Sequence, residues 1–179
     1  MAGITKTHVQ LGDSATATNN FMLTAQTADG TMKLARGNNG ATTQDILTVD
    51  TNGVVSLTNG MLSKSSITSL GYATGAGGAV TQLTSKTTTV TLNTPTGQVT
   101  MNAASLAAAA SVTFNINNSI VGPNDLVVLN LTSGSSQPDS YAVRCRIASQ
   151  VIAVTLTNYG GTEAAAIVLQ YSIIKGAVA

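Results

Sequence analysis

Charged residues are scarce in this sequence. Lys, Arg, Asp and Glu make up 8% of its 179 positions, where an ordinary soluble domain carries about 25%. Eight Lys and Arg stand against seven Asp and Glu, so the chain lacks the basic footprint of a nucleic-acid-binding protein. Disorder is also disfavoured, because 43% of the residues are hydrophobic and can bury enough apolar area to offset the lost chain entropy.

Cysteine, aromatic residues and long apolar runs are also scarce. Cys145 is the only cysteine, which excludes an intrachain disulfide and a cysteine-based zinc site. The first residues lack the apolar core of a signal peptide, and no run of about 18 apolar residues is present for a spanning helix. We therefore expect a protein that is made in a cytoplasm, stays soluble and has no membrane partner.

Hydroxyl, amide and β-branched side chains replace the missing charge. Ser, Thr and Asn occupy 58 positions, and Val, Ile and Thr occupy 54, which favours strands. The mean hydropathy of +0.24 is high for a monomer, and apolar surface is usually hidden by a partner subunit. The composition predicts an all-β protein that forms oligomers.

A glycine-rich segment marks the expected domain boundary. Residues 71–78 contain four glycines, which remove side chains that could anchor a core. We therefore expect a β-rich region at 1–70, a linker at 71–78 and a second domain at 79–179.

Two hairpins are predicted in residues 1–70. Their strands are residues 21–25 with 31–36, and residues 45–50 with 54–58. The turns contain Asp29-Gly30 and Asn52-Gly53, dipeptides that tolerate the positive φ angles of tight hairpins.

The apolar side chains of the first hairpin are expected to group together. Met32 and Leu34 should share one face, with Phe21 and Leu23 supplying the side that faces it. An isolated hairpin buries too little surface to be stable. We expect this region to need neighbouring chains or a host surface to complete its core.

Eight strands are predicted in the second domain, separated by turns rich in Gly, Pro, Asn and Ser. They are residues 79–84, 87–93, 97–102, 111–117, 125–132, 140–149, 150–157 and 164–174. Short strands at this spacing are typical of a β-sandwich, here of jelly-roll type. Val112, Phe114 and Ile116 alternate with polar residues, as expected of a strand with one buried face.

Burial or local structure is also predicted for three other segments. Residues 126–131 and 164–169 are apolar at nearly every position and are expected to be covered on both faces. The alanine-rich stretch 103–110 has high helix propensity but no amphipathic face, so we expect a connection with at most one helical turn.

The search for catalytic residues finds no site. Glycosidic cleavage needs two carboxylates about 5–10 Å apart, and Glu163 is the only glutamate. Asp125 and Asp139 stand in expected turns, where Asp commonly hydrogen-bonds its own backbone. His8 is the sole histidine, and no Gly-x-Ser-x-Gly elbow supplies a nucleophile for it. We assign no catalytic residue and favour a surface or contact role for His8.

Metal and cofactor sites are also not assigned. Residues 50–53 match part of a calcium loop but lack the distal Glu and further oxygen ligands, so a hairpin turn is preferred. Residues 75–78 lack the Lys-Ser/Thr and helix of a phosphate loop, so a linker is preferred.

Three positions are candidates for recognition. Arg144 and Arg146 share a strand face and could clamp a carboxylate or sugar acid, although an exposed face or an intersubunit ion pair with Asp139 or Glu163 is preferred. Cys145 lies on the opposite face as a small core residue. Tyr159, between glycines, is expected to be the most exposed tyrosine, with a structural role preferred over glycan binding.

Several stretches resemble proteins of tailed-bacteriophage virions. In the first region they are Leu11-Gly12-Asp13, Asn20-Phe21-Met22-Leu23, and residues 29–38, 44–50 and 52–55. Residues 71–82, 85–87, 90–93 and 114–119, with the strands that follow, resemble a C-terminal domain common to phage fibre and head-decoration proteins. The similarity covers most of the chain and brings no catalytic motif.

The resemblance implies a homotrimer on a virion surface. Residues 1–70 would attach to the major capsid protein and trimerise, and residues 79–179 would form the outer domain. Because 179 residues leave little room for a long shaft, we favour a capsid decoration, cement or head-fibre protein. The alternative is a receptor-binding tail fibre or tip that binds host surface glycan. A depolymerase spike is disfavoured by the missing carboxylate pair.

Overall fold

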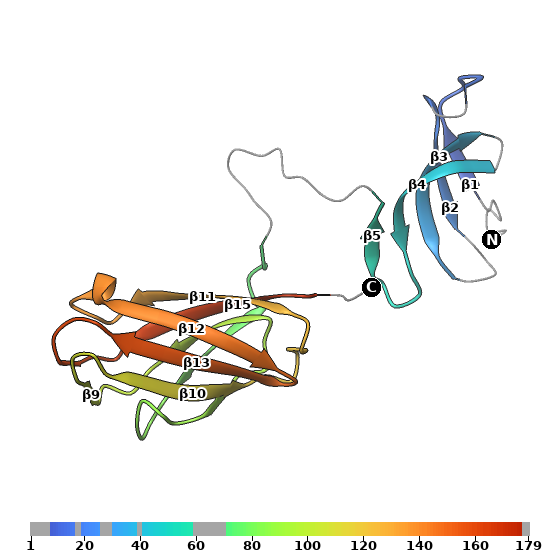
Figure 1. Cartoon of the computed structure of the whole chain (residues 1–179). Coiled ribbons are helices and arrows are strands. Elements are labelled where there is room, and N and C mark those ends of the chain that lie inside the picture. Colours follow the sequence, from blue (N-terminus) through green and yellow to red (C-terminus); the bar gives the residue numbers. More distant parts are fainter. Residues whose placement is uncertain (1–7, 17–18, 26–29, 39–40, 59–70, 177–179) are drawn as a thin grey trace. The chain divides into compact units, whose positions relative to one another are not determined.

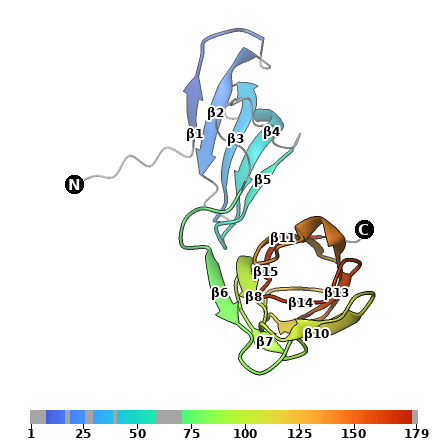
Figure 2. The ribbon, with the colours of Figure 1, turned by 90° about the vertical axis from the view of Figure 1, so that its left-hand side faces the viewer.

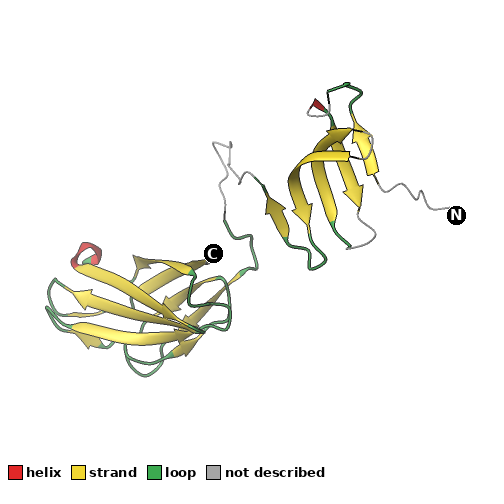
Figure 3. Ribbon diagram, turned by 45° about the vertical axis from the view of Figure 1, so that its right-hand side comes forward, coloured by secondary structure: helices red, strands yellow, loops and turns green. Residues whose placement is uncertain are grey.

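The computed structural model describes residues 8–16, 19–25, 30–38, 41–58 and 71–176. The fold is all-β, with a short 3-10 turn at Pro138–Ser140 (Figure 3). The chain divides into two compact units, Met1–Leu70 and Gly71–Ala179. Each unit is described by itself.

The N-terminal unit is a five-stranded antiparallel meander (Figure 1). Its strands are β1 (His8–Leu11), β2 (Phe21–Ala25), β3 (Met32–Asn38), β4 (Ala41–Val49) and β5 (Val55–Leu57). Each strand pairs with its sequence neighbours. Both predicted hairpins, β2–β3 and β4–β5, are therefore confirmed.

Strand β1 was not predicted, because a long connection rather than a tight turn separates it from β2. It pairs with β2 and places His8 opposite Thr24. His8 thus belongs to a sheet edge.

The turn between β4 and β5 is built by Asp50. Its Oδ1 accepts hydrogen bonds from the backbone N–H groups of Asn52, at 2.9 Å, and Val54, at 2.8 Å. Gly53 has a φ of +78°, a conformation that favours glycine. The preference for a hairpin turn over a calcium loop at 50–53 is confirmed.

The C-terminal unit contains two four-stranded sheets around a common core (Figure 2). One has the order β12-β13-β10-β7 and the other β11-β15-β8-β6. The strands of the first are β12 (Tyr141–Ala148), β13 (Val151–Asn158), β10 (Ser111–Asn117) and β7 (Val90–Thr91). Those of the second are β11 (Leu126–Ser133), β15 (Val168–Ile174), β8 (Thr96–Thr100) and β6 (Gly77–Thr81). All eight predicted strands are present, some of them shorter than expected.

Two pairings and one small sheet go beyond the prediction. Strands β6 and β8 are parallel, as are β7 and β10. Strand β9 (Ser105–Leu106) pairs with β14 (Glu163–Ala164). The alanine-rich segment 103–110 therefore contributes a short strand and a turn, and the helical turn allowed for it does not form.

The expected linker 71–78 ends within a strand. Gly77 and Gly78 open β6 and pair with Thr96 and Gly97 of β8. A Cβ on Gly78 would lie 2.8 Å from the Leu92 side chain, and one on Gly97 would lie 2.6 Å from it. These glycines let Leu92 pack directly on the strand backbones. Glycine is therefore needed at these two positions for packing and not only for a flexible linker.

The core of the C-terminal unit is formed by the inward residues of both sheets. Val112, Phe114 and Ile116 are buried and the residues between them are exposed, which confirms the predicted alternation. The prediction that residues 126–131 are covered on both faces is wrong, because Leu126 and Val128 are more than half exposed. Strand β11 lies at the edge of its sheet, and its outer face is uncovered.

A buried polar network joins the sheets near β15. The Asn118 Nδ2 donates to the carbonyl oxygens of Leu92, at 2.7 Å, and Thr94, at 2.9 Å, and lies 3.2 Å from the Tyr171 hydroxyl. Asn118 and Tyr171 are each 1% exposed. Burial raises the pKa of Tyr171, so its hydroxyl remains a neutral hydrogen-bonding group.

Candidate interaction surfaces

One face of the N-terminal sheet is apolar across all five strands. The pairing register aligns Val9, Leu23, Leu34, Leu47 and Leu57 in one row, and paired residues of antiparallel strands share a face. Leu11, Phe21, Met32, Val49 and Val55 complete this surface, which we call the apolar face. The predicted shared face of Met32 and Leu34 is confirmed, and Phe21 and Leu23 lie on that same face.

The apolar face has no covering layer among the described residues. None of its ten side chains is buried, and Val9, Leu23 and Val55 are 51%, 42% and 56% exposed. The two fully buried apolar side chains of the unit's described part, Met22 and Ala35, lie on the opposite face. A sheet normally buries its more apolar side; in this unit that side is open.

Charge is placed away from this face or at its end. Lys33 and Asp45 form an ion pair of 2.9 Å on the opposite face. Arg36 lies on the apolar side, in the end row with Phe21, and its guanidinium carbon is 5.4 Å from the centroid of the Phe21 ring. The middle of the face is entirely aliphatic.

Glu163 is held by the loop that follows β11. Its carboxylate accepts hydrogen bonds from the hydroxyls of Ser135, at 2.7 Å, Ser136, at 2.7 Å, and Tyr141, at 3.0 Å, and from the Ser136 N–H, at 2.6 Å. These bonds, led by that of Ser135, lower the pKa of Glu163 to about 2. Burial and then Glu163 raise the pKa of Tyr141 to about 12. Glu163 therefore ties a loop to two strands as a permanent anion.

Asp125 has a similar role at the other end of β11. It accepts hydrogen bonds from the Lys175 ammonium, at 2.5 Å, and from the N–H groups of Gly122, at 2.8 Å, and Gly176, at 3.0 Å. These bonds, led by that of Lys175, lower its pKa to about 2. Strand β11, with eight residues, separates Asp125 from the loop that holds Glu163 by about 25 Å. The two acids cannot act on one bond.

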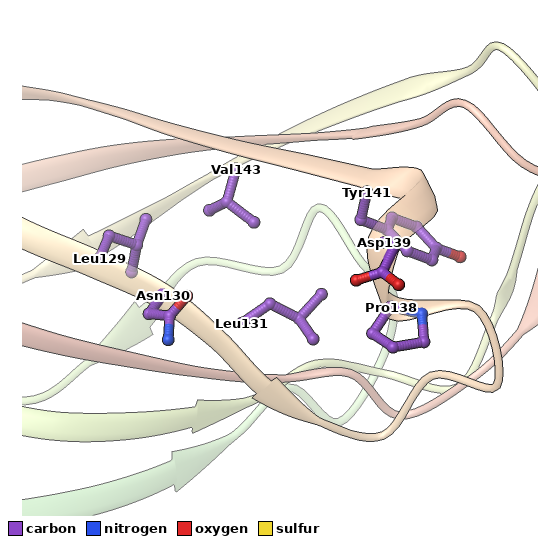
Figure 4. A pocket seen from close by; sticks show the side chains of 7 residues that line it. All are labelled: Leu129, Asn130, Leu131, Pro138, Asp139, Tyr141 and Val143. Atoms are coloured by element: carbon purple, nitrogen blue, oxygen red, sulfur yellow. The ribbon is translucent and has the colours of Figure 1, made fainter.

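The described cavity of the C-terminal unit lies between the edge strands β11 and β12 (Figure 4). It has a volume of about 330 Å³, and Leu129, Leu131, Tyr141 and Val143 supply its apolar lining. Asp139, exposed in the 3-10 turn, stands at its rim with Asn130. The turn at Asp139 is predictable from the sequence, but the cavity is not, because it depends on two strands that do not pair.

Arg144 and Arg146 project from the outer face of β12. Both are exposed, and neither forms an ion pair with a described residue of this chain. Glu163, one of the two acids considered for an intersubunit ion pair, is held within this chain by three hydroxyl groups and a backbone N–H. Cys145 is half-buried against the core, and burial raises the pKa of its thiol, as expected of a packing residue.

Tyr159 is 71% exposed, and no hydrogen bond joins its hydroxyl to a described residue. The buried Asn158 beside it fixes the loop, since its Nδ2 donates to the carbonyl oxygens of Leu106, at 3.1 Å, and Gly161, at 2.7 Å. The predicted exposure of Tyr159 is confirmed, whereas the hydrogen-bonded structural role preferred for it is not found.

Lys86 and Gln82 are buried polar residues that no sequence pattern predicts. Lys86 is 4% exposed, and its ammonium donates to the carbonyl oxygens of Asn102 and Ala165, both at 2.6 Å. Gln82 is 1% exposed and bonds the backbone at Lys86 and Thr88. Burial lowers the pKa of Lys86. Both residues stand in a polar stretch that looks like a surface turn.

The described residues contain no group of three or more His, Cys, Asp or Glu side chains that could hold a metal ion. No helix in the described part is both long and apolar enough to span a membrane. No family model, curated protein or solved structure matches this chain.

Proposed function

We propose that this protein is a non-enzymatic structural protein of a tailed-bacteriophage virion, which decorates or cements the capsid as a homotrimer. It is assembled in the host cytoplasm and lies on the capsid surface. The observation that carries the proposal is the apolar face, because a sheet left open on its more apolar side serves a protein that works within an assembly. The sequence resemblance supplies the kind of assembly.

Residues 1–70 form the attachment and trimerisation region in this proposal, and the C-terminal unit is the outer domain. Its two four-stranded sheets support a jelly-roll-like description, from which the parallel pairs at β6 and β7 depart. The commitment of Asp125 and Glu163 to loop anchoring supports a structural role over a catalytic one. A trimer that touches several major capsid proteins would gain attachment strength through effective concentration and so resist internal pressure from packaged DNA.

The test is to count copies in purified particles. Quantitative mass spectrometry against the major capsid protein should find hundreds of copies per particle, with density for this protein on the head in cryo-electron microscopy. A few copies, or a few tens, would place it at the tail or a vertex. Absence from purified particles would refute the proposal.

Receptor binding through host surface glycan is the second candidate. Tyr159 favours it, because an exposed ring on a fixed loop is a suitable stacking platform for a sugar. Arg144 and Arg146 could add charge-assisted bonds to an acidic sugar. A glycan array probed with the unaltered protein and with Tyr159→Ala and Arg144→Ala variants tests this. Binding lost in the variants supports the receptor role, and no binding to any glycan refutes it.

A further inference from the structure

From the geometry of the N-terminal sheet we infer that its apolar face packs against the same face of two sister copies and forms the core of the trimer. The inference deepens the proposed function, from which it takes the threefold symmetry. It names sister chains, and not the capsid protein, as the partner of this face.

The composition of the face favours sister copies. Interfaces between proteins that also exist apart are about as polar as the rest of the surface, whereas the interfaces of obligate homo-oligomers are more apolar. Here ten apolar side chains form a continuous surface, and the one charged group among them, Arg36, lies at the end over the Phe21 ring. A surface of this kind is poorly suited to a protein that must first fold alone and then find a capsid.

The area of the face does not choose between two copies and three. Five strands about 4.8 Å apart, with five residues of about 3.4 Å each, give a face of about 400 Å². Each copy would bury this face once in either assembly, so the threefold arrangement rests on the proposed function.

The register explains how three faces could close on one axis. The row from Val9 to Leu57 crosses every strand at the middle of the face. Turned inward from three sheets, these rows would meet at the same height and form an aliphatic layer. The ion pair of Lys33 and Asp45 on the opposite face would then point outward.

Two neighbouring residues on β5 give a matched test. Val55 lies on the apolar face and Ser56 on the opposite face, and both are exposed in the single chain. The full-length variants Val55→Glu and Ser56→Glu therefore carry the same charge at nearly the same place. Sedimentation velocity should give a trimer for the unaltered protein and for Ser56→Glu. The buried charge in Val55→Glu should raise the dissociation constant at least ~100-fold.

A second variant, on another strand, controls for local unfolding caused by Val55→Glu. Val9→Glu places the charge on β1, at the other edge of the same face, and should also give monomers, while Val55→Ile should keep the trimer. Circular dichroism of each variant reports whether the strands remain.

A monomeric unaltered protein, or a trimer that survives both glutamate substitutions, would overturn the inference. A dimer dissolved by both would overturn the threefold arrangement and uphold packing between sister copies. Because sedimentation needs no phage particle, these outcomes are independent of whether the protein is found on virions.

Discussion

Removing the Asn118 side chain should destabilise the C-terminal unit far more than removing the Tyr171 hydroxyl beside it. In Asn118→Ala the carbonyl oxygens of Leu92 and Thr94 each lose an amide donor, and the N–H of Ile120 loses its bond to Oδ1, which is 2.9 Å long. At about 1 kcal/mol for each bond, the expected loss is about 3 kcal/mol.

Tyr171→Phe should cost only about 1 kcal/mol, because it leaves no buried donor or acceptor without a partner. The hydroxyl lies 3.1 Å from each of the carbonyl oxygens of Leu92 and Thr94, and the Asn118 amide still bonds both of them after the change. Asn118→Ala therefore removes three bonds and leaves the single Tyr171 hydroxyl proton to serve both carbonyl oxygens, whereas Tyr171→Phe leaves every one of these buried groups with a partner.

Tyrosine fluorescence is a selective assay for these variants. The chain has no tryptophan and four tyrosines, at positions 72, 141, 159 and 171, all in the C-terminal unit. At ~4–8 °C per kcal/mol for a unit of this size, Asn118→Ala should lower the melting temperature by ~12 °C or more and Tyr171→Phe by ~4–8 °C. Equal shifts in the two variants would refute the reasoning.

Glu163, Gly97 and Asp50 each allow a further test at another place in the chain. Folding lowers the pKa of Glu163 from 4.5 to about 2, so the stability it adds is complete above pH 4.5 and is lost as the pH falls toward 2. In urea titrations over that range, Glu163→Gln should lose less stability than the unaltered protein, and equal losses would contradict this. Gly97→Ala should lower the free energy of unfolding by ~1–3 kcal/mol, because its Cβ would lie 2.6 Å from the Leu92 side chain. Gly71→Ala, with nothing within 4 Å of its Cβ, should leave the melting temperature unchanged, and a similar shift in both variants would show that packing at Leu92 is not the cause. Asp50→Ala removes the acceptor for the N–H groups of Asn52 and Val54. It should speed amide hydrogen exchange in β4 and β5 by about 5-fold, equivalent to ~1 kcal/mol, and unchanged exchange would show that the turn does not stabilise this strand pair.

The strands and turns of this chain could largely be predicted because their signals are local. The alternation of Val112, Phe114 and Ile116 places one face of β10 in the core. The Asn52-Gly53 pair marks the turn between β4 and β5. Each of these features depends on neighbouring residues alone, so a sequence pattern suffices.

The sheet edges and buried polar groups could not be predicted in this way. Residues 126–131 are apolar in sequence, but the edge position of β11 leaves Leu126 and Val128 exposed. The Lys86 ammonium donates to the carbonyl oxygen of Ala165, and the Gln82 Oε1 accepts from the N–H of Asn102, and both partners are distant in sequence. The apolar face was only partly predictable. The hairpin pattern predicted its first residues, but its full extent depends on the register of all five strands.

The mass of the full-length protein in dilute buffer tests the central claim most directly. If sister copies complete the N-terminal sheet, sedimentation equilibrium should give about three times the chain mass of 18.0 kDa without any other protein present. A stable, fully folded species of 18.0 kDa that shows no tendency to associate would contradict the account.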